Sequence, residues 1–184
     1  MEVREPDPPL SDGVVTLRPW TLDDVAAIAR SCNDPEVARW IHQIPSPYGE
    51  KDAREYVRAT QAAWREETGA FFAIVDAATN EPVGAIAMHV LDPAFGNVEV
   101  GYWIATPVRG RGLTTRALAL ISRWAIDSVG VQRIQLRADV LNAASLRVAE
   151  KAGFTREGTL RSAAFNQRQN RRIDYAVYSL LPGE

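Results

Sequence analysis

Apolar residues recur along the chain at two different spacings, and the spacing predicts the type of each element. In some stretches every second residue is apolar, which is typical of a strand with one buried face. In others the apolar residues recur every three or four positions, which is typical of an amphipathic helix. Strands are predicted at residues 14–20, 70–75, 82–89, 97–104, 133–140, 154–160 and 172–181, and helices after Thr21 and at residues 34–41, 50–67, 113–130 and 142–152.

The order of these elements predicts a mixed sheet. The strands at 70–75, 82–89 and 97–104 are joined by short turns, so they are expected to run antiparallel. A helix separates the strand at 97–104 from the strand at 133–140, and such a crossover implies a parallel pair. The predicted fold class is α/β (α+β): a mixed, mostly antiparallel sheet of about seven strands, flanked by helices.

Composition places the chain among single globular domains. It has 184 residues, of which 46% are hydrophobic and 24% charged, so one domain spanning residues 1–184 is expected, with residues 1–12 as a flexible N-terminal extension. Neither a signal peptide nor a membrane-spanning run is expected, and a single cysteine, Cys32, fits a reducing cytoplasm as a buried thiol. With only two histidines, a structural metal site is not expected.

The formal net charge of −2 conceals two halves of opposite sign. Residues 1–100 hold 8 basic and 17 acidic side chains, whereas residues 101–184 hold 13 and 6. A basic half suits a phosphorylated ligand and an acidic half suits a cationic acceptor, although solvated surface can be equally uneven. Nucleic-acid binding is not favoured, because the isoelectric point is near 5.8 and the arginines are not interleaved with aromatic residues.

Residues 106–115 join a strand to a helix through two glycines flanked by arginines. The first N–H groups of a helix lack partners within it, so this junction can bind an anion. Gly110 and Gly112 would let a pyrophosphate approach the amides, and Arg109 and Arg111 would supply charged donors. A tight turn that merely requires glycine is the alternative, and the stretch lacks the Gly-Lys-Ser/Thr of a P-loop.

Three motifs follow one another in the second half of the chain. They are Glu99-Val100-Gly101-Tyr102-Trp103-Ile104, Arg109-Gly110-Arg111-Gly112-Leu113-Thr114-Thr115, and Asn142-Ala143-Ala144-Ser145 followed by Glu150-Lys151-Ala152-Gly153-Phe154. In this order they resemble the GNAT superfamily of acyl-CoA-dependent N-acyltransferases, specifically its RimJ/RimL-like branch, which includes ribosomal-protein N-terminal acetyltransferases. The resemblance covers nearly the whole chain.

The resemblance implies a sheet that splays apart between the strand of Glu99 and the strand of Leu136. The pantetheine arm of acetyl-CoA would lie in the gap, bound by strand backbone as an added strand would be, and the pyrophosphate would lie on the amides of the glycine-rich turn. The implied cofactor-binding residues are Ile104, Ala105, Arg109, Gly110, Arg111, Gly112, Leu113, Thr114, Thr115, Asn142 and Ser145.

The implied reaction moves an acetyl group from acetyl-CoA to a primary amine by direct attack in a ternary complex. The amine would belong to a protein N-terminus or to a small molecule, and no metal is implied. Glu99 is a candidate base, with attraction of a cationic acceptor or pairing with an arginine as the alternatives. Ser145 is the candidate group at the departing sulfur, because Ala149 stands where many members have a tyrosine acid.

Three aromatic residues are predicted to bind the acceptor. Trp40 precedes a proline-containing loop at residues 42–49 and Tyr48 lies within it; the two would form walls of a substrate slot or, alternatively, anchor the loop to the core. Trp103 is expected on the same strand face as Glu99, because the two are four residues apart on one strand.

Some features leave other functions open. Pro107 replaces a Gln or Arg found in many members, and Arg116 stands where this branch often has Glu. Pro107 and Ala149 together leave open a non-catalytic acyl-CoA sensor. Transfer of another acyl group, such as succinyl, is a further alternative. A homodimer through the last strands is expected by analogy alone.

Overall fold

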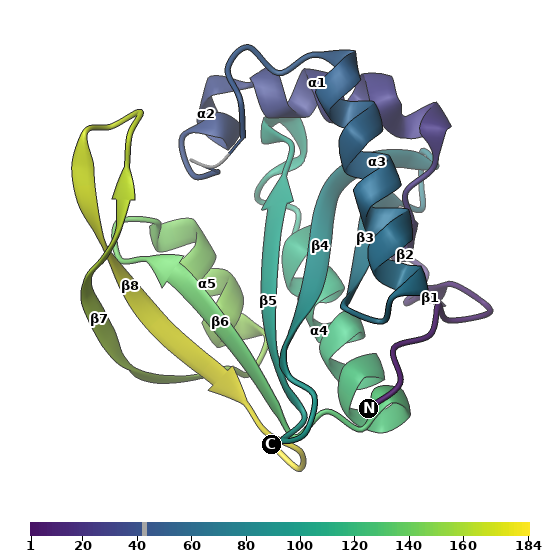
Figure 1. The fold of residues 1–184 in the computed structure, drawn as a ribbon, viewed down its shortest axis with the longest axis vertical. Helices are drawn as coiled ribbons and strands as arrows, with labels where there is room; N and C mark the ends of the chain where they lie inside the picture. Colours follow the sequence, from purple (N-terminus) through teal and green to yellow (C-terminus); the bar gives the residue numbers. More distant parts are fainter. Residues whose placement is uncertain (42–43) are drawn as a thin grey trace.

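A computed structural model of the chain, which describes residues 1–41 and 44–184, shows one twisted sheet with helices on both faces (Figure 1). The strands are β1 (Leu10–Ser11), β2 (Val15–Pro19), β3 (Gly69–Asp76), β4 (Glu81–Asp92), β5 (Asn97–Ile104), β6 (Arg133–Asp139), β7 (Thr155–Asn166) and β8 (Arg171–Leu180). The helices are α1 (Val25–Asn33), α2 (Pro35–Ala38), α3 (Glu50–Arg65), α4 (Leu113–Trp124) and α5 (Ala143–Lys151), with 3-10 turns at Leu22–Asp24 and Thr106–Val108 and a π-helical turn at Ala125–Val129.

The described residues form one sheet of eight strands in the order β1-β2-β3-β4-β5-β6-β8-β7. Its strand pairs are antiparallel except β5 and β6, which are parallel. The antiparallel run β3-β4-β5 and the parallel crossover through α4 confirm the predicted topology. The extra strand is β1, which has two residues and is therefore too short to show a period of two.

The segment predicted as a flexible N-terminal extension makes several contacts with the domain. Leu10 and Ser11 pair with β2, and Val3 is fully buried in the core. Asp12 forms an ion pair with Arg116 of α4 at 2.8 Å. These contacts hold parts of residues 1–12 against the sheet.

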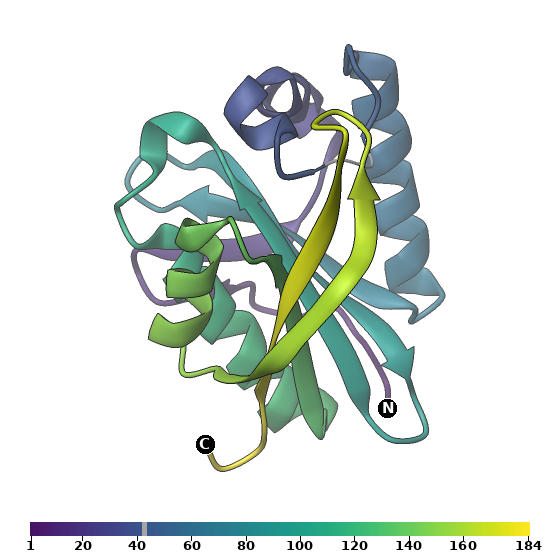
Figure 2. The same ribbon diagram turned by 90° about the vertical axis from the view of Figure 1, so that its left-hand side faces the viewer.

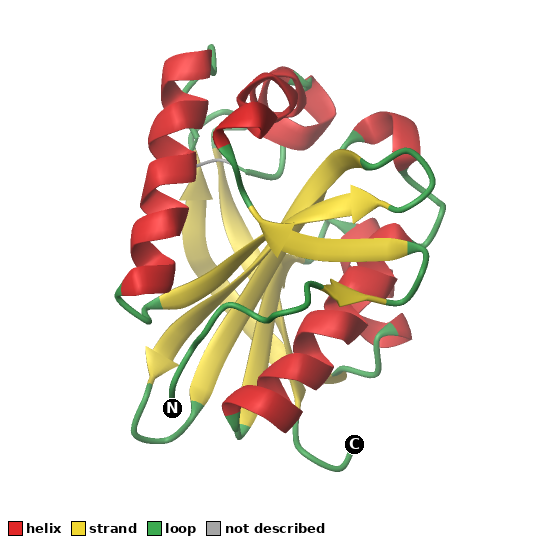
Figure 3. Cartoon of the chain, turned by 90° about the vertical axis from the view of Figure 1, so that its right-hand side faces the viewer, coloured by secondary structure: helices red, strands yellow, loops and turns green. Residues whose placement is uncertain are grey.

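The sheet separates two hydrophobic clusters. The larger lies on the face covered by α4 and α5, and it includes Val98 and Val100 of β5. The smaller lies against α1 and α3 and includes Trp20, with Trp103 packed against it. Figure 3 shows α3 and α4 on either side of the strands. Alternation along β5 thus directs Glu99 and Trp103 toward the same face, as predicted, and the structure shows that this is the α1–α3 face. Tyr102 is directed toward the α4–α5 face.

The parallel pair β5–β6 is short, and this creates the central feature of the fold. Pairing is confined to Asn97, Val98 and Glu99 with Arg133, Ile134 and Gln135. Beyond this point β5 continues along β4, whereas β6 continues along β8. The two strands diverge in Figure 1 with α5 beside β6, so the predicted central splay is confirmed.

Candidate active site

A cleft of about 1050 Å³ runs through the splay. It is lined by residues of β4, β5 and β6, by the turn before α4, by the first part of α5, and by residues of α1 and α2. The predicted site residues that line it are Trp40, Tyr48, Glu99, Trp103, Ile104, Arg109, Gly110, Arg111, Gly112, Leu113, Thr114, Thr115, Asn142 and Ser145. Ala105 is the predicted residue that does not.

The turn before α4 presents backbone N–H groups to this cleft. Gly110 and Gly112 have φ angles of 79° and 78°, a left-handed conformation that favours glycine. The first helical hydrogen bond runs from Arg116 N–H to Gly112 O at 3.1 Å, so the N–H groups of Leu113 and Thr114 have no partner within α4. A methyl group added at either glycine would meet no atom within 4 Å, so a ligand has room beside both.

The arginines of this turn are paired with acids of the first half of the chain. Arg111 lies 2.7 Å from the buried Asp76 carboxylate. Arg109 donates to the backbone oxygen of Glu36 at 3.2 Å, and its guanidinium is 3.9 Å from the Glu36 carboxylate. Some arginines of the basic half therefore form ion pairs with acids of the acidic half within the protein. The N–H groups of Leu113 and Thr114 are unpartnered donors of the turn, and each guanidinium keeps further N–H groups beside its ion pair.

Backbone groups of β5 are also available in the splay. Ala105, which the resemblance implied as a cofactor-binding residue, donates its N–H to Val83 O at 2.8 Å and so extends the ladder with β4; this N–H is not free for a ligand. Because hydrogen-bonding direction alternates along a strand, the N–H and C=O of Tyr102 and Ile104 point away from β4. They face the gap where β6 has diverged, so an extended ligand could pair with them.

Glu99 is held at the point where the splay begins. Arg137 donates to it twice, from Nε to Oε2 at 2.7 Å and from NH2 to Oε1 at 2.8 Å, and Gln135 Nε2 donates to Oε2 at 2.9 Å. A carboxylate oxygen accepts about two hydrogen bonds. Oε2 is therefore saturated, while Oε1 retains one acceptor position.

His89 lies across from Glu99 on β4 and also lines the cleft. Partial desolvation lowers the pKa of the His89 imidazole, and the Glu99 carboxylate opposes this shift. A neutral imidazole therefore lies beside the Glu99 carboxylate at neutral pH.

Ser145 and Asn142 lie at the start of α5. The Asn142 side chain accepts a hydrogen bond from Ser145 N–H at 3.2 Å and so caps this helix. The Ser145 hydroxyl is 3.0 Å from the hydroxyl of Tyr102, whose side chain reaches it from β5. The site thus contains a tyrosine hydroxyl, although on a strand rather than on the helix that carries Ala149.

The opposite part of the cleft has mainly apolar and aromatic walls. Trp103 stacks on Trp20 with ring centroids 6.4 Å apart and planes at 18°. Tyr48 is buried, while Trp40 is half-buried under the Arg39 guanidinium at 4.9 Å. Of the loop predicted at residues 42–49, residues 42 and 43 lie outside the described part of the chain. Further lining residues on this side are Ile28, Cys32, Val37, Ile44, Tyr56, Phe71, Ala85 and Ala87.

Cys32 is buried, as predicted, and is therefore a poor nucleophile. Burial raises the pKa of its thiol to about 11, so the thiol remains protonated at neutral pH. No group of three His, Cys, Asp or Glu side chains that could hold a metal ion is found among residues 1–41 and 44–184. No helix in the same ranges has the length and apolar character needed to cross a bilayer.

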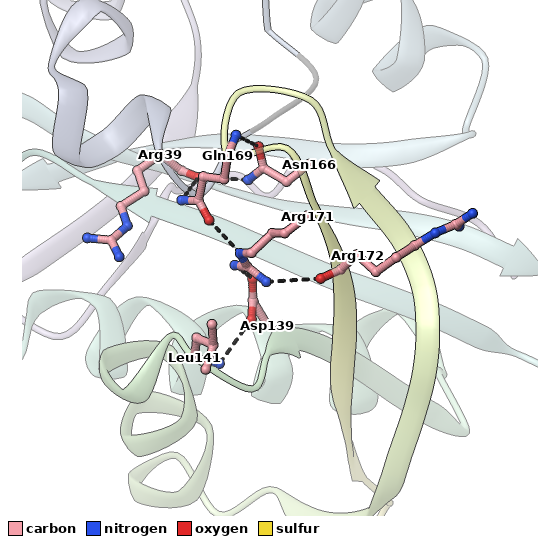
Figure 4. A network of polar contacts seen from close by, with 7 residues as sticks. All are labelled: Arg39, Asp139, Leu141, Asn166, Gln169, Arg171 and Arg172. Carbon is pink, nitrogen blue, oxygen red and sulfur yellow. Dashed lines mark hydrogen bonds and ion pairs between the residues drawn. The ribbon is translucent and has the colours of Figure 1, made fainter.

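The tip of the β7–β8 hairpin is tied to both sides of the cleft (Figure 4). Asn166, which is 1% exposed, donates to Arg39 O at 3.2 Å and accepts from Gln169 N–H at 3.0 Å. Arg171 donates to Gln169 Oε1 at 2.6 Å and forms an ion pair with Asp139 at the end of β6. Figure 2 shows the hairpin reaching toward α2. The hairpin thereby links β6 to the segment after α2.

Residues 15–155 match the family described as the acetyltransferase (GNAT) domain. The chain belongs to this family. The predicted enzyme class, an acetyl-CoA-dependent N-acetyltransferase, is confirmed by this membership and by the relatives below, as is the predicted kinship with RimJ/RimL-like proteins.

Known proteins similar to this GNAT acetyltransferase come from several bacteria. It is 25% identical over 170 residues to the uncharacterized N-acetyltransferase p20 of Bacillus licheniformis, covering 92% of this chain and 94% of that one. It is 31% identical over 117 residues to the ribosomal-protein-serine acetyltransferase of Escherichia coli, covering 63% and 64%. The structure of Mycobacterium smegmatis RimJ in complex with CoA-disulfide superposes with a TM-score of 0.84 at 24% identity, covering 95% and 86%.

Sequence reasoning missed four side chains of the site: His89, Tyr102, Gln135 and Arg137. Tyr102 was visible only as one of the alternating apolar positions of β5. Gln135 and Arg137 alternate with apolar residues on β6, and that pattern shows that they share a face but not that they meet Glu99. The strand alternation was the available signal, and the register between β5 and β6 was the missing information.

Proposed function

We propose that this enzyme transfers the acetyl group of acetyl-CoA to the N-terminal amine of a protein, by direct attack in a ternary complex. The observation that carries the proposal is the splay, which opens beyond the three residue pairs that join β5 to β6. The residues that line its cleft come from both faces of the sheet. Donor and acceptor would reach the gap from opposite faces, so that both can be bound at once.

The residues present fit the diphosphate and the extended arm of coenzyme A. The amides of Gly110 to Thr114 would bind the pyrophosphate, with open space beside both glycines and the positive end of α4 behind it. The backbone groups of Ile104 would pair with the pantetheine arm. Asn142 and Ser145 would contact the arm near the sulfur. Because Arg109 and Arg111 are paired with acids, their contribution would be smaller than that of the amides.

Glu99 would orient the attacking amine through the free acceptor position of Oε1. Arg137 and Gln135 fix the carboxylate in one orientation, which favours precise placement of the nitrogen over strong basicity. Passage of the amine proton to Glu99 itself, or to the neighbouring His89, is consistent with this geometry. Arg137 is neutralised by Glu99 and offers no free charge for an acidic acyl group, which favours acetyl over succinyl.

The acceptor side favours an amine whose neighbouring group is apolar. Its walls are largely aromatic and aliphatic, while the acids of the first half that lie near the site pair with arginines. A cationic acceptor is therefore less favoured than the charge asymmetry of the sequence indicated. The ribosomal-protein acetyltransferases among the relatives support a protein N-terminus, and a small apolar amine is the second candidate.

Release of coenzyme A thiol in the presence of acetyl-CoA and a panel of amines tests the proposal. The panel would contain short peptides with apolar, polar and charged first residues, together with small amines. Turnover that is highest with apolar first residues is expected. Binding of acetyl-CoA without turnover on any amine would instead favour the sensor. Cytoplasmic location and a homodimer remain predictions, and native mass spectrometry of the purified protein would test the latter.

A further inference from the structure

Tyr102 and Ser145 meet across the splay on the face covered by α4 and α5. The Tyr102 hydroxyl lies 3.0 Å from Ser145 Oγ and 3.1 Å from the Ser145 carbonyl oxygen. Both residues line the cleft, and the chain between them contains the glycine-rich turn, α4 and β6. The contact therefore joins the two diverging sides of the site.

Three oxygens share two hydroxyl hydrogens in this contact, which allows two arrangements. If Tyr102 donates to the carbonyl oxygen, the Ser145 hydroxyl is free to donate to the Tyr102 oxygen. If Tyr102 donates to Ser145 Oγ, the Ser145 hydrogen must find another acceptor. In the second arrangement Ser145 donates into the cleft, and the tyrosine selects that direction.

We propose that Tyr102 is a positioning residue for the leaving thiolate, which it serves by donating to Ser145 Oγ and so directing the Ser145 O–H toward the sulfur of coenzyme A. This inference rests on the proposed function. In the reaction the amine nitrogen forms a bond to the carbonyl carbon, the carbon–sulfur bond breaks, and the sulfur keeps the electron pair. The amine loses its proton on the Glu99 side, and both hydroxyl groups keep their own.

The surroundings of Tyr102 suit a permanent donor rather than an acid. Burial raises the pKa of the Tyr102 phenol to about 12, so the hydroxyl keeps its hydrogen at neutral pH and would not give it up to a thiolate. The hydrogen bond to Asn142 holds the backbone N–H of Ser145 at the helix start, whereas the Ser145 O–H can still rotate about its C–O bond. By donating to Ser145 Oγ, Tyr102 would favour the rotation that turns this O–H into the cleft.

The test is a spectroscopic titration of the thiol of bound coenzyme A, which requires no acceptor. Thiolate absorbance would be followed against pH in the wild type, Tyr102→Phe, Ser145→Ala and the double variant. The pKa of the bound thiol is expected to be lower in the wild type than in Tyr102→Phe by about one unit, a tenfold change in ionisation. The double variant is expected to match Ser145→Ala alone, because the two hydroxyl groups act in series.

A matched control is Tyr178→Phe. Tyr178 is a buried tyrosine of β8 that donates to Glu150 at 3.2 Å and does not line the cleft. This substitution also removes one hydroxyl from a packed ring, and it should leave the thiol pKa unchanged. With acceptor present, Tyr102→Phe should lower kcat about tenfold while KM for acetyl-CoA stays the same.

The outcomes separate this inference from the proposed function. Equal thiol pKa values in the wild type and Tyr102→Phe, with coenzyme A bound by both, would overturn the inference and leave the proposed function standing. A raised KM for acetyl-CoA with unchanged kcat would also overturn it, because Tyr102 would then only set the width of the splay. A wild-type protein that binds no coenzyme A would overturn both.

Discussion

The Glu99 carboxylate is held by the Arg137 guanidinium through two hydrogen bonds, of 2.7 Å and 2.8 Å. A group proposed to receive the amine is thus also one half of an ion pair. These two roles predict different responses to substitution. If Glu99 orients the amine, its loss affects turnover; if it serves only the pair, its loss affects folding.

Glu99→Gln is expected to lower kcat/KM for the amine about a hundredfold, because the amide no longer offers a charged acceptor on its fixed oxygen. KM for acetyl-CoA should not change. Glu157→Gln is the matched control, since Glu157 of β7 is likewise bonded twice by an arginine, Arg133 of β6, and does not line the cleft. Full activity in Glu99→Gln together with a lower melting temperature would assign Glu99 to the ion pair alone.

Gly112→Ala is expected to weaken acetyl-CoA binding at least tenfold, because the added methyl group projects into the space assigned to the pyrophosphate. Gly130→Ala is its control, since Gly130 follows the π-helical turn after α4 and has a similar φ of 81° with open space beside it. Both substitutions should cost about 1–2 kcal/mol of folding free energy from the left-handed conformation. Calorimetric titration with acetyl-CoA measures the affinity of each variant. Equal affinity in Gly112→Ala and Gly130→Ala would contradict the assignment of the pyrophosphate to this turn.

Trp103→Ala is expected to reduce discrimination among acceptors. Trp103 forms a stacked pair with Trp20 at the wall of the acceptor side, and its removal deletes apolar surface from that wall. Peptides with an apolar first residue should lose about tenfold in kcat/KM, whereas those with a charged first residue should change little. Steady-state kinetics with both peptide sets provides the measurement. An equal loss for both sets would indicate general damage to the site.

Glu157→Gln is also expected to change the dependence of stability on pH. Hydrogen bonds, first from Arg133 and then from Ser179, lower the pKa of the Glu157 carboxyl to about 2 from its ordinary 4.5. The unfolded chain therefore binds more protons between these values, so the contribution of Glu157 is present above about pH 4.5 and is lost as the pH falls toward 2. Denaturant unfolding across this range should show the wild type and variant converging at low pH. A difference in unfolding free energy between the wild type and the variant that stays the same at every pH would contradict the lowered pKa of Glu157.

The glycine-rich turn was predictable because its signal is local. Two glycines between a period-two run and an amphipathic run indicate a strand-to-helix turn, and the structure places Gly110 and Gly112 in the left-handed region there. The shared face of Glu99 and Trp103 was equally accessible, since alternation along one strand determines it. Family resemblance supplied the splay and the co-substrate, which residue spacing alone did not indicate.

The partners of these residues were not predictable from the same signals. Arg137 reaches Glu99 because β5 and β6 pair in one particular parallel register, with Glu99 opposite Gln135, and the residue spacing within either strand alone does not give that register. Arg111 meets Asp76 although the two lie on different elements far apart in the sequence. The hydrogen bond from Ala105 N–H to Val83 O was not predictable for a related reason, because the ladder between β4 and β5 continues one residue past the apolar alternation.

The divergence of β6 leaves β5 with an open edge in the interior of the sheet rather than at its rim. Exposed strand edges usually invite pairing with other chains and hence aggregation. Here β6, α5 and the β7–β8 hairpin flank the opening, so this edge is shielded more than an edge at the rim of the sheet would be. A slender molecule with amide groups at intervals could pair with it. The geometry of the fold therefore keeps a strand edge, which elsewhere promotes self-association, in a place where a narrow ligand can use it.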